Sequence, residues 1–306
     1  MPELPEVEVV RLFLQTHLVG KTISKLEIIT PKSFVGNPEH VEGQKIISTS
    51  RLGKQLSLHL QYGLILLFHL KMTGQIIFVP ISPARQDYEV VGGSRGGREA
   101  GRVSLGHPTR DAFSSMPSKS TRLIFTFSDK SKLYFNDQRK FGWVKLLSPT
   151  ELVEAQKNVG IDLLSPKFTS KYFYHQLQSS SRAIKQVLLD QSKFAGIGNI
   201  YANDALFLSH IHPQISSKKI SFTQSKILHQ KLIKIIKESI SQGGSTAKDN
   251  KYIHPDGSHG QHQFHFRVYQ RENEPCLKCK TLIKKIKIGG RGTFYCPVCQ
   301  KSSDKI

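Results

Sequence analysis

Apolar residues in the first twenty positions of the chain recur every three to four residues, a spacing that predicts an amphipathic helix. Pro5 suits the first turn of such a helix, and Gly20 suits its end. The residues that share the apolar face are Val10, Phe13, Leu14 and Leu18. We therefore expect the chain to open with a helix that packs on a core.

The part that follows this helix contains short apolar segments bounded by turn residues, which is the pattern of β-strands. Residues 122–127 and 132–135 are joined by Ser-Asp-Lys-Ser and predict a hairpin. The other predicted strands are 22–29, 45–51, 55–60, 64–70 and 75–79. We assign residues 1–148 to a mostly antiparallel β domain that carries the N-terminal helix.

Residues 80–120 interrupt the strand pattern of this domain. They are rich in Gly, Ser, Pro and Arg and show no apolar periodicity. A segment of this composition buries little apolar surface, so we interpret it as a flexible insertion. Its arginines could contact phosphates, but a solvated loop without a specific role is the favoured interpretation.

From Pro149 onward the apolar spacing becomes helical. The predicted helices are 170–177, 182–191, 199–209 and 223–241. Gly243 and Gly244 follow the last helix as a stop signal, and the His-rich residues 254–265 predict a loop. We assign residues 149–262 to a helical domain and 263–306 to a separate cysteine module, so the expected fold class is α+β with several domains.

The charge of the chain indicates the kind of partner that the protein binds. Its 44 Lys and Arg residues outnumber 23 Asp and Glu residues, which gives a net charge of +21. Such an excess favours a polyanionic partner, nucleic acid first and an anionic membrane surface second. The chain has no apolar run long enough to span a membrane, and its start is acidic where a secretory signal is basic. We expect a cytoplasmic, nucleoid-associated protein.

All four cysteines lie in two CxxC pairs near the C-terminus, separated by residues 280–295. This spacing predicts one structural Zn²⁺ held by four thiolates, and four free thiols are the alternative. The segment between the pairs predicts a hairpin of 282–288 and 293–295, with Arg291 in its turn at 289–292. An arginine there can reach a phosphate. The metal ligands are Cys276, Cys279, Cys296 and Cys299.

The first residues of the chain carry a second candidate chemistry. Removal of Met1 would leave Pro2 with a free secondary amine, and α-amines titrate at about 7.7–8.0, so part of this amine is neutral and nucleophilic near pH 7. Attack on a sugar C1′ would form an iminium that promotes β-elimination, with Glu3 as general acid and base. The alternative is an ordinary helix entry, in which Pro and Glu are favourable first-turn residues.

Further motifs follow the opening Met1-Pro-Glu-Leu-Pro-Glu-Val-Glu8 in a fixed order. They are Arg51-Leu-Gly-Lys54, His69-Leu-Lys-Met72-Thr-Gly74, Asp137-Gln-Arg139-Lys-Phe141-Gly142 and Phe194-Ala-Gly-Ile-Gly-Asn199-Ile-Tyr201-Ala. Together with the cysteine module they resemble the formamidopyrimidine-DNA glycosylase family, which includes the endonuclease VIII-type enzymes. The resemblance spans nearly the whole chain apart from the 80–120 insertion.

This resemblance implies an N-terminal β-sandwich, a helical domain with a helix–two-turn–helix element and a C-terminal zinc hairpin. It implies a bifunctional DNA glycosylase and AP lyase of base excision repair, which excises 8-oxoguanine and formamidopyrimidines through a Pro2 imine. The strand is then cleaved by β,δ-elimination. The expected partner is double-stranded DNA with an oxidised base or an abasic site, bound by a monomer without membrane contact.

The resemblance also implies a role for individual residues. Pro2 is the nucleophile, Glu3 is its acid/base partner, and Lys54 holds a phosphate beside the flipped nucleotide. Arg139 faces the orphaned base. The other implied DNA contacts are the wedge residues Met72 and Phe141 and the phosphate ligands Asn199 and Arg291.

Each of these assignments has a plain structural alternative. Met72 and Phe141 follow predicted strands and precede glycines, which predicts loop tips, but either could instead pack in a core. Lys54 could be a solvated lysine at a strand end, and Asn199 could be a helix N-cap. We interpret His69 as a hydrogen-bonded structural histidine.

Two other functions remain as alternatives. An endonuclease VIII-type glycosylase for oxidised pyrimidines has the same fold, but Leu4 and the pair Arg139 and Phe141 favour the purine enzyme. A non-catalytic zinc-containing nucleic-acid-binding protein explains the charge and the cysteines but leaves Pro2 and Glu3 without a role.

Overall fold

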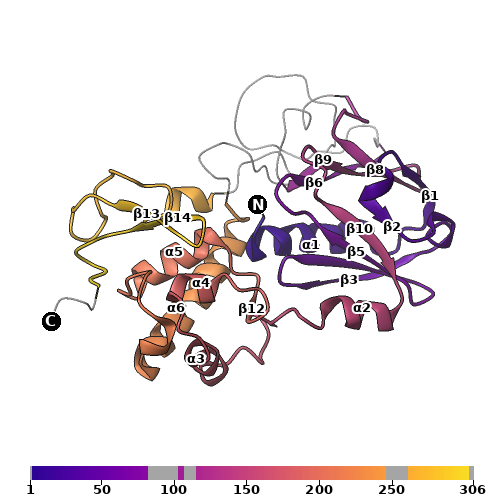
Figure 1. Ribbon diagram of the computed structural model, residues 1–306. Helices are drawn as coiled ribbons and strands as arrows, with labels where there is room; N and C mark the ends of the chain where they lie inside the picture. Colours follow the sequence, from indigo (N-terminus) through magenta and orange to yellow (C-terminus); the bar gives the residue numbers. More distant parts are fainter. Residues whose placement is uncertain (1, 82–102, 107–114, 246–260, 303–306) are drawn as a thin grey trace. The chain divides into compact units, whose positions relative to one another are not determined.

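The computed structural model describes residues 2–81, 103–106, 115–245 and 261–302 (Figure 1). They form two compact units. The first unit contains Pro2, Glu6–Lys157 and Ser245, and the second contains Glu3–Pro5, Asn158–Gly244 and the described residues from Gln261 onward. The three-domain division expected from the sequence differs from these units and stays a prediction.

The predicted N-terminal helix is confirmed as α1 (Leu4–Leu18). Its side chains Val7, Val10, Leu14 and Leu18 are buried in the core of the first unit, and Phe13 packs partly buried against the same core. Leu4, by contrast, belongs to the core of the second unit. The first residue of α1 therefore belongs to a different core from the rest of its apolar face.

Two five-stranded sheets build the first unit. The first sheet has the order β1-β8-β9-β6-β7, with the strands Ile23–Ile28, Thr121–Phe127, Lys132–Asp137, Gly74–Val79 and Val103–Gly106. The second has the order β2-β10-β5-β4-β3, with the strands Phe34–Val35, Trp143–Leu147, Ile65–His69, Gln55–Leu60 and Ile46–Leu52. Neighbouring strands are antiparallel except β2 and β10, which are parallel.

Large apolar rings join the two sheets of the first unit into a sandwich. Phe68 of β5 lies with its ring centroid 6.0 Å from that of Phe125 on β8 and 6.2 Å from that of Phe135 on β9. All three side chains are buried in one core together with the apolar face of α1. Such buried aromatic pairs add directional contacts to the area that they remove from water. The expected β-sandwich is confirmed.

Three strands of the first unit were not predicted: β2, β7 and β10. Trp143–Leu147 forms β10 because it finds β5 on one side and β2 on the other, and these partners lie far away in sequence. Val103–Gly106 forms β7 against β6, so this part of the predicted insertion is a strand. Most of the remaining insertion lies outside the described residues. The helix α2 (Pro149–Gln156), capped by Ser148 and Glu151, also belongs to the first unit.

The second unit is helical and has its own core. Its elements are α3 (Ser170–Gln178), α4 (Ile184–Leu188), α5 (Asn199–Leu208), α6 (Phe222–Ser241) and the short pair β11 (Ile161–Asp162) with β12 (Phe194–Ala195). The helix α4 ends earlier than the predicted 182–191, because the Asp190 carboxylate accepts the backbone N–H of Ser192 at 3.1 Å and stabilises a turn there. His262–His265 forms a short 3₁₀ helix within the predicted loop. None of the helices in the described ranges is long and apolar enough to cross a membrane.

The predicted hairpin near the C-terminus is confirmed as β13 (Lys284–Ile288) and β14 (Arg291–Tyr295). Its turn is the pair Gly289 and Gly290, with φ of 55° and 77°, a backbone conformation that tight two-residue hairpins require. The longer predicted turn at 289–292 is therefore wrong. Arg291 is the first residue of β14 and pairs with Ile288.

Candidate active site

The glycine-rich turn before α5 leaves room for the start of the chain. A Cβ on Gly198 would lie 1.9 Å from Cδ of Glu3, and one on Gly196 would lie 2.5 Å from Cδ1 of Leu4. Gly196 also has a φ of +107°, which favours glycine. The backbone N–H of Leu4 donates to the carbonyl of Gly196 at 3.1 Å. These glycines allow Glu3 to approach the helix terminus closely.

Glu3 occupies the N-terminal end of α5. Its side chain is buried, and its Oε1 accepts the backbone N–H of Ile200 at 3.1 Å. The free N–H groups and the dipole of a helix N-terminus stabilise a carboxylate at this position. The structure thus holds Glu3 in one orientation, immediately after Pro2 in the chain.

Lys185 is a functional candidate that the sequence interpretation missed. It is buried on the apolar face of α4, and its Nζ donates to the carbonyl of Gly292 at 2.9 Å and to Oγ1 of Thr293 at 2.7 Å. Burial lowers the pKa of Lys185 to about 7, with Arg291 acting in the same direction and Glu3 against it. A lysine on the apolar side of a predicted helix was the signal that could have revealed it.

Asn199 and Arg291 lie in the same region of the second unit. Asn199 is the first residue of α5 and Gly198 is the N-cap, so the predicted alternative of an Asn199 cap is wrong. The Nδ2 of Asn199 donates to the carbonyl of Gly292 at 3.1 Å, one residue after Arg291. Asn203 strengthens this link because its Oδ1 accepts the backbone N–H of Phe294 at 2.9 Å. The contacts join α5 to the zinc hairpin and place Glu3, Lys185 and Arg291 around one centre of positive and negative charge.

The first unit holds Lys54 in the turn between β3 and β4, where Gly53 has a φ of 58°. Lys54 is buried, so the alternative of a solvated lysine is wrong. Nearby, Arg51 donates to Glu8 at 2.7 Å and ties the end of β3 to α1.

His69 is a neutral structural histidine. Burial lowers its pKa to about 3, and the charges of Lys71 and Lys54 act in the same direction. Its Nδ1 accepts the backbone N–H of Lys71 at 3.0 Å.

Met72, Arg139 and Phe141 come together on the surface of the first unit. The side chains of Met72 and Phe141 are 42% and 55% exposed, so core packing is wrong for both. The guanidinium of Arg139 lies 4.9 Å from the ring centroid of Phe141, and its Nη1 lies 3.1 Å from Sδ of Met72. We call these three residues the wedge.

A buried carboxylate supports the two loops of the wedge. Asp137 accepts a hydrogen bond from the Thr73 hydroxyl, next to Met72. It also accepts the backbone N–H of Arg139 at 3.2 Å and that of Gly142 at 2.5 Å. One side chain therefore fixes the backbone on both sides of Phe141 and the loop that carries Met72.

Pro2 is buried in the first unit, and Met1 lies outside the described residues. Glu6 is also buried there, and its Oε1 accepts from the backbone N–H of Ser245 at 2.9 Å and from its hydroxyl at 3.0 Å. Glu6 thereby holds Ser245, the last described residue before 246–260.

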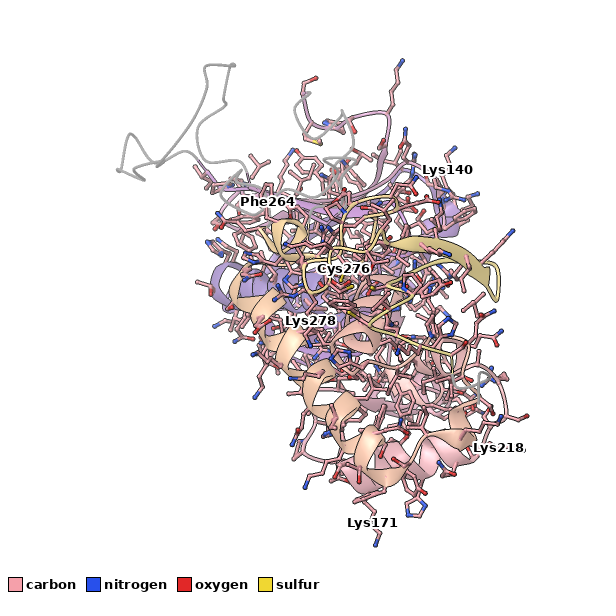
Figure 2. All side chains as sticks on the ribbon, turned by 90° about the vertical axis from the view of Figure 1, so that its left-hand side faces the viewer. Lys140, Lys171, Lys218, Phe264, Cys276 and Lys278 are labelled. Carbon is pink, nitrogen blue, oxygen red and sulfur yellow. The ribbon has the colours of Figure 1, made fainter. Side chains whose placement is uncertain are left out.

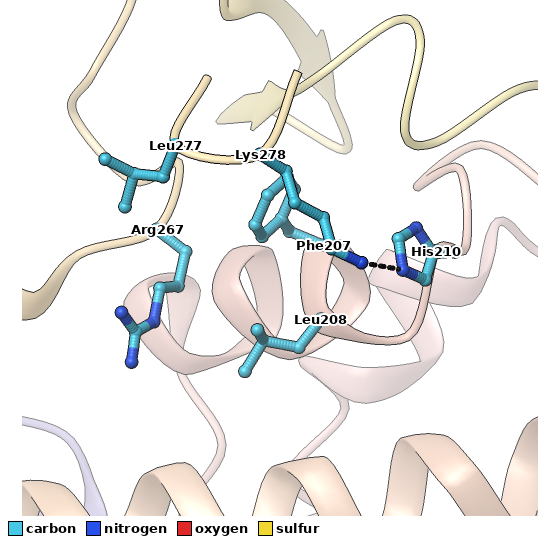
Figure 3. Close-up of a pocket in the computed structure, with 6 residues that line it drawn as sticks. All are labelled: Phe207, Leu208, His210, Arg267, Leu277 and Lys278. Atoms are coloured by element: carbon cyan, nitrogen blue, oxygen red, sulfur yellow. Dashed lines mark hydrogen bonds between the residues drawn. The ribbon is translucent and has the colours of Figure 1, made fainter. Parts of the chain in front are cut away.

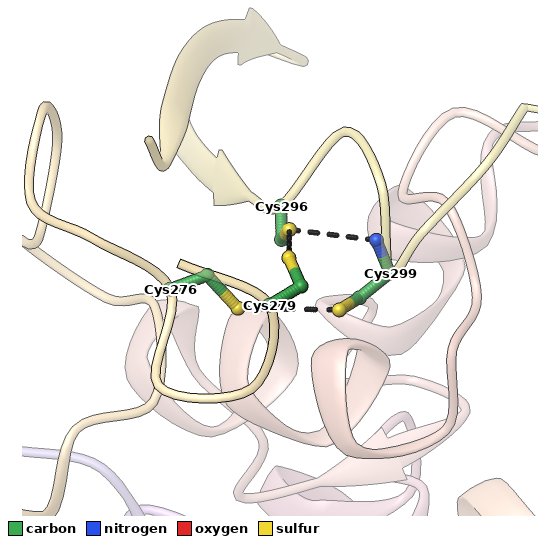
Figure 4. A group of neighbouring side chains, drawn as sticks. All are labelled: Cys276, Cys279, Cys296 and Cys299. Carbon is green, nitrogen blue, oxygen red and sulfur yellow. Dashed lines mark hydrogen bonds between the residues drawn. The ribbon is translucent and has the colours of Figure 1, made fainter. Parts of the chain in front are cut away.

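The four cysteines meet the geometric requirement of a zinc site (Figure 4). Their sulfur atoms all lie within 4.8 Å of one another, with 3.9 Å between Cys276 and Cys299 and 3.4 Å between Cys279 and Cys296. A Zn–S bond of about 2.3 Å in a tetrahedron separates sulfurs by about 3.8 Å. Four thiolates fill the coordination sphere, so the residues fit one structural Zn²⁺ and leave no open position for catalysis. The predicted ligand set is confirmed.

A small hollow lies beside the zinc module. It has a volume of about 190 Å³ and is lined by Phe207, Leu208, His210, Arg267, Leu277 and Lys278 (Figure 3). The Lys278 ammonium donates to Nε2 of His210 at 2.9 Å, and Nδ1 of His210 lies 3.0 Å from the carbonyl of Cys299. These contacts attach the first cysteine loop to α5 and contain none of the predicted catalytic residues.

Three family models match this chain. They describe the formamidopyrimidine-DNA glycosylase N-terminal domain at residues 1–144, the H2TH domain of the same enzyme at 159–251, and the zinc finger found in FPG and IleRS at 273–301. Fold and site thus define a zinc-containing DNA glycosylase of the helix–two-turn–helix class. The chain belongs to the formamidopyrimidine-DNA glycosylase family, as the full-length relatives below also show.

Curated relatives and solved structures cover almost the whole chain. The formamidopyrimidine-DNA glycosylase of Bacillus licheniformis is 36% identical over 98% of this chain and 100% of its own length. That of Pelotomaculum thermopropionicum is 34% identical over 98% and 99%. The MutM (Fpg) structure from Thermus thermophilus superposes with a TM-score of 0.80 at 30% identity, over 99% of this chain and 100% of that one. A Lactococcus lactis Fpg bound to Fapy-dG DNA reaches 0.79 at 30% identity, over 98% and 100%.

Proposed function

We propose that this protein is a bifunctional DNA glycosylase and AP lyase that excises oxidised purines, chiefly 8-oxoguanine and formamidopyrimidines, from duplex DNA. The observation that carries the proposal is the buried Glu3, which the glycine turn and the N-terminus of α5 orient next to Pro2. Lactococcus lactis relatives were solved with Fapy-dG DNA and with DNA containing an abasic site, which supports the same substrate class here.

The chemistry follows from the two first residues of the mature chain. The Pro2 nitrogen attacks C1′ of the damaged nucleotide, the bond from C1′ to the base breaks, and the base leaves with a proton. The Glu3 carboxylate takes the proton that the Pro2 nitrogen loses on attack and passes it to the sugar ring oxygen, so that the ring opens to an iminium. Loss of a C2′ proton then expels the 3′ phosphate, and a second elimination expels the 5′ phosphate. Lys54 holds a phosphate beside the flipped nucleotide.

The wedge residues supply the remaining step, which is extrusion of the damaged nucleotide. Flipping costs a few kcal/mol in lost stacking and pairing, and an apolar wedge offsets this cost. Met72 and Phe141 are apolar and exposed, and Arg139 between them can donate hydrogen bonds to the orphaned base.

Asn199 and Arg291 bind backbone phosphates. We place the reaction in the cytoplasm, next to the bacterial chromosome, in a monomer.

Borohydride trapping tests this proposal directly. We expect a covalent complex between the protein and an oligonucleotide that contains 8-oxoguanine, because borohydride reduces the iminium. A variant with an uncleavable N-terminal tag ahead of Pro2 should bind the same duplex but form no complex. Trapping only on oxidised pyrimidines would favour the endonuclease VIII-type activity, and binding without any trapping would favour a non-catalytic protein.

A further inference from the structure

Two long segments of the second unit are basic and contain no acidic residue. Neither residues 163–189 nor residues 205–237 contain an Asp or Glu. These segments form α3, the 3₁₀ helix η4 (Ser217–Lys219) and most of α6. Their exposed lysines at the end of the unit that holds α3 and η4 are Lys171, Lys218, Lys219 and Lys226, which we call the α3–α6 basic face. Figure 2 shows Lys171 and Lys218 at this end, far from Cys276 in the zinc module.

Packing between the helices brings these cations together. The Ser217 hydroxyl donates to the carbonyl of Leu177 at 2.8 Å, and Nε2 of Gln178 donates to the carbonyl of Ile220 at 3.0 Å. These bonds place η4, with Lys218 and Lys219, against the C-terminal end of α3. The basic residues of the two segments therefore share one surface.

An aromatic pair lies between the cations. The ring centroids of Tyr174 and Phe222 are 5.3 Å apart with an interplanar angle of 88°. Lys171 precedes Tyr174 by about one helical turn, and Lys226 follows Phe222 by about one turn, so each lysine lies on the same helix face as its ring. Phe222 remains 48% exposed despite its contact with Tyr174.

The charges of this face are not compensated within the described part of the chain. None of its four lysines forms an ion pair with a described acidic residue. A patch of point charges without acids is the electrostatic footprint of a polyanion. Lysine is depleted in the cores of protein interfaces, which makes an acidic protein the weaker candidate.

We propose that the α3–α6 basic face binds a single-stranded segment of DNA, separately from the site around Glu3. The lysines contact its phosphates, and Phe222 stacks on an unpaired base, a contact that a duplex does not offer because its bases are paired inside. The proposal rests on the DNA-binding function proposed above. It gives the enzyme a second contact with DNA that is independent of base sequence.

The test uses the full-length zinc-loaded protein with its lesion site already occupied. The protein is first saturated with a short duplex that carries an uncleavable abasic-site analogue, and a fluorescein-labelled oligothymidine of about twelve nucleotides is then titrated at several salt concentrations. Anisotropy should report binding of the single strand. Each phosphate contact on a single strand contributes about 0.7 to the salt slope, so Lys218→Ala with Lys219→Ala should lower the slope by about 1.4.

The aromatic contact has a different signature from the lysines. Phe222→Ala should weaken single-strand binding by about tenfold, as for the loss of one stacked base, and leave the salt slope unchanged. Phe222→Leu keeps an apolar side chain without a ring and should weaken binding similarly, which guards against a folding defect in the alanine variant. The control is Lys25→Ala with Lys32→Ala, two exposed lysines of the first unit with the same charge change.

Three results would overturn the proposal. Equal weakening by the control pair would mean that only the net charge of the chain matters. Displacement of the oligothymidine by an unlabelled duplex of equal length, without an effect of Phe222, would assign the face to duplex phosphates. Binding of an acidic peptide but not of the single strand would assign it to a protein. A protein that fails to bind the analogue duplex in the first step would instead contradict the proposed function.

Discussion

Burial gives Lys185 a pKa that a lysine in water does not have. The side chain is fully buried on α4, and its hydrogen bonds to Gly292 and Thr293 satisfy two of its three donors. Burial disfavours the ammonium and lowers the pKa to about 7, while the Glu3 carboxylate limits the shift. A lysine whose pKa lies near neutral pH is a candidate for proton transfer.

The first prediction concerns how this lysine makes the stability of the folded protein depend on pH. Its pKa is about 7 in the folded protein against 10.5 for an unperturbed lysine, so between these values the unfolded chain binds more protons. The free energy of unfolding should therefore rise with pH across this window, reach its full value above 10.5, and stay level at its lower value below about 7, where both states are protonated. Lys185→Met should remove most of this rise, as urea unfolding at a series of pH values would show. Lys237→Met, at an exposed position of α6, is the control, and the same loss of slope there would contradict the assignment.

At the scale of elements, the wedge depends on two loops and on the carboxylate that holds them. Thr73 and Gly142 belong to different loops, and both donate to Asp137. A side chain without this support would have to be ordered when DNA binds, at a cost in conformational entropy. The buried Asp137 thus prepares Met72, Arg139 and Phe141 before the encounter with DNA.

We expect Phe141→Ala to slow excision of 8-oxoguanine from duplex DNA by on the order of tenfold, the factor that corresponds to about 1.4 kcal/mol of the unstacking cost. The same variant should process a preformed abasic site almost normally, since little base remains to unstack. Single-turnover kinetics on both substrates would measure this difference. Equal losses on the two substrates would remove the wedge role, and Tyr62→Ala, at an exposed aromatic residue of the first unit, is the control.

A further element-scale prediction concerns the zinc hairpin. Cys276 is a buried member of the cluster that joins β14 and α5, so Cys276→Ser should remove the metal and release Arg291 from its position. DNA affinity should fall while the β-sandwich stays folded, because that unit has a separate core. Metal analysis together with thermal unfolding would check both statements. Val298→Ser changes a residue between two ligands and should keep the zinc, and an active wild-type protein without zinc would contradict the site.

At the scale of the whole molecule, the net charge of +21 predicts that the affinity for DNA depends strongly on salt concentration. Each phosphate contact on B-DNA releases counterions and adds about 0.9 to the slope of log affinity against log salt. Arg291→Ala should therefore lower this slope by about 0.9 and weaken binding to damaged and undamaged duplexes alike, because a phosphate contact carries no sequence information. Titrations at several salt concentrations would measure the slope. An unchanged slope would mean that Arg291 does not contact DNA.

The sequence by itself determined the features that depend on residues close together in the chain. The zinc ligands of the two CxxC pairs and the hairpin of β8 and β9 could be predicted because their spacing encodes the metal site or the turn. The positions of Met72 and Phe141 in exposed loops could also be predicted, since each follows a strand and precedes a glycine.

Only the tertiary structure decided the features that depend on partners far away in the chain. The strands β7 and β10 form because β6 and β5 offer unpaired edges, and the start of α5 takes Gly198 as its cap because Glu3 needs the space. The low pKa of Lys185 and the support of the wedge by Asp137 likewise come from burial and from contacts between distant segments. Burial and long-range hydrogen bonds are properties of the packed chain, and no local pattern of residues encodes them.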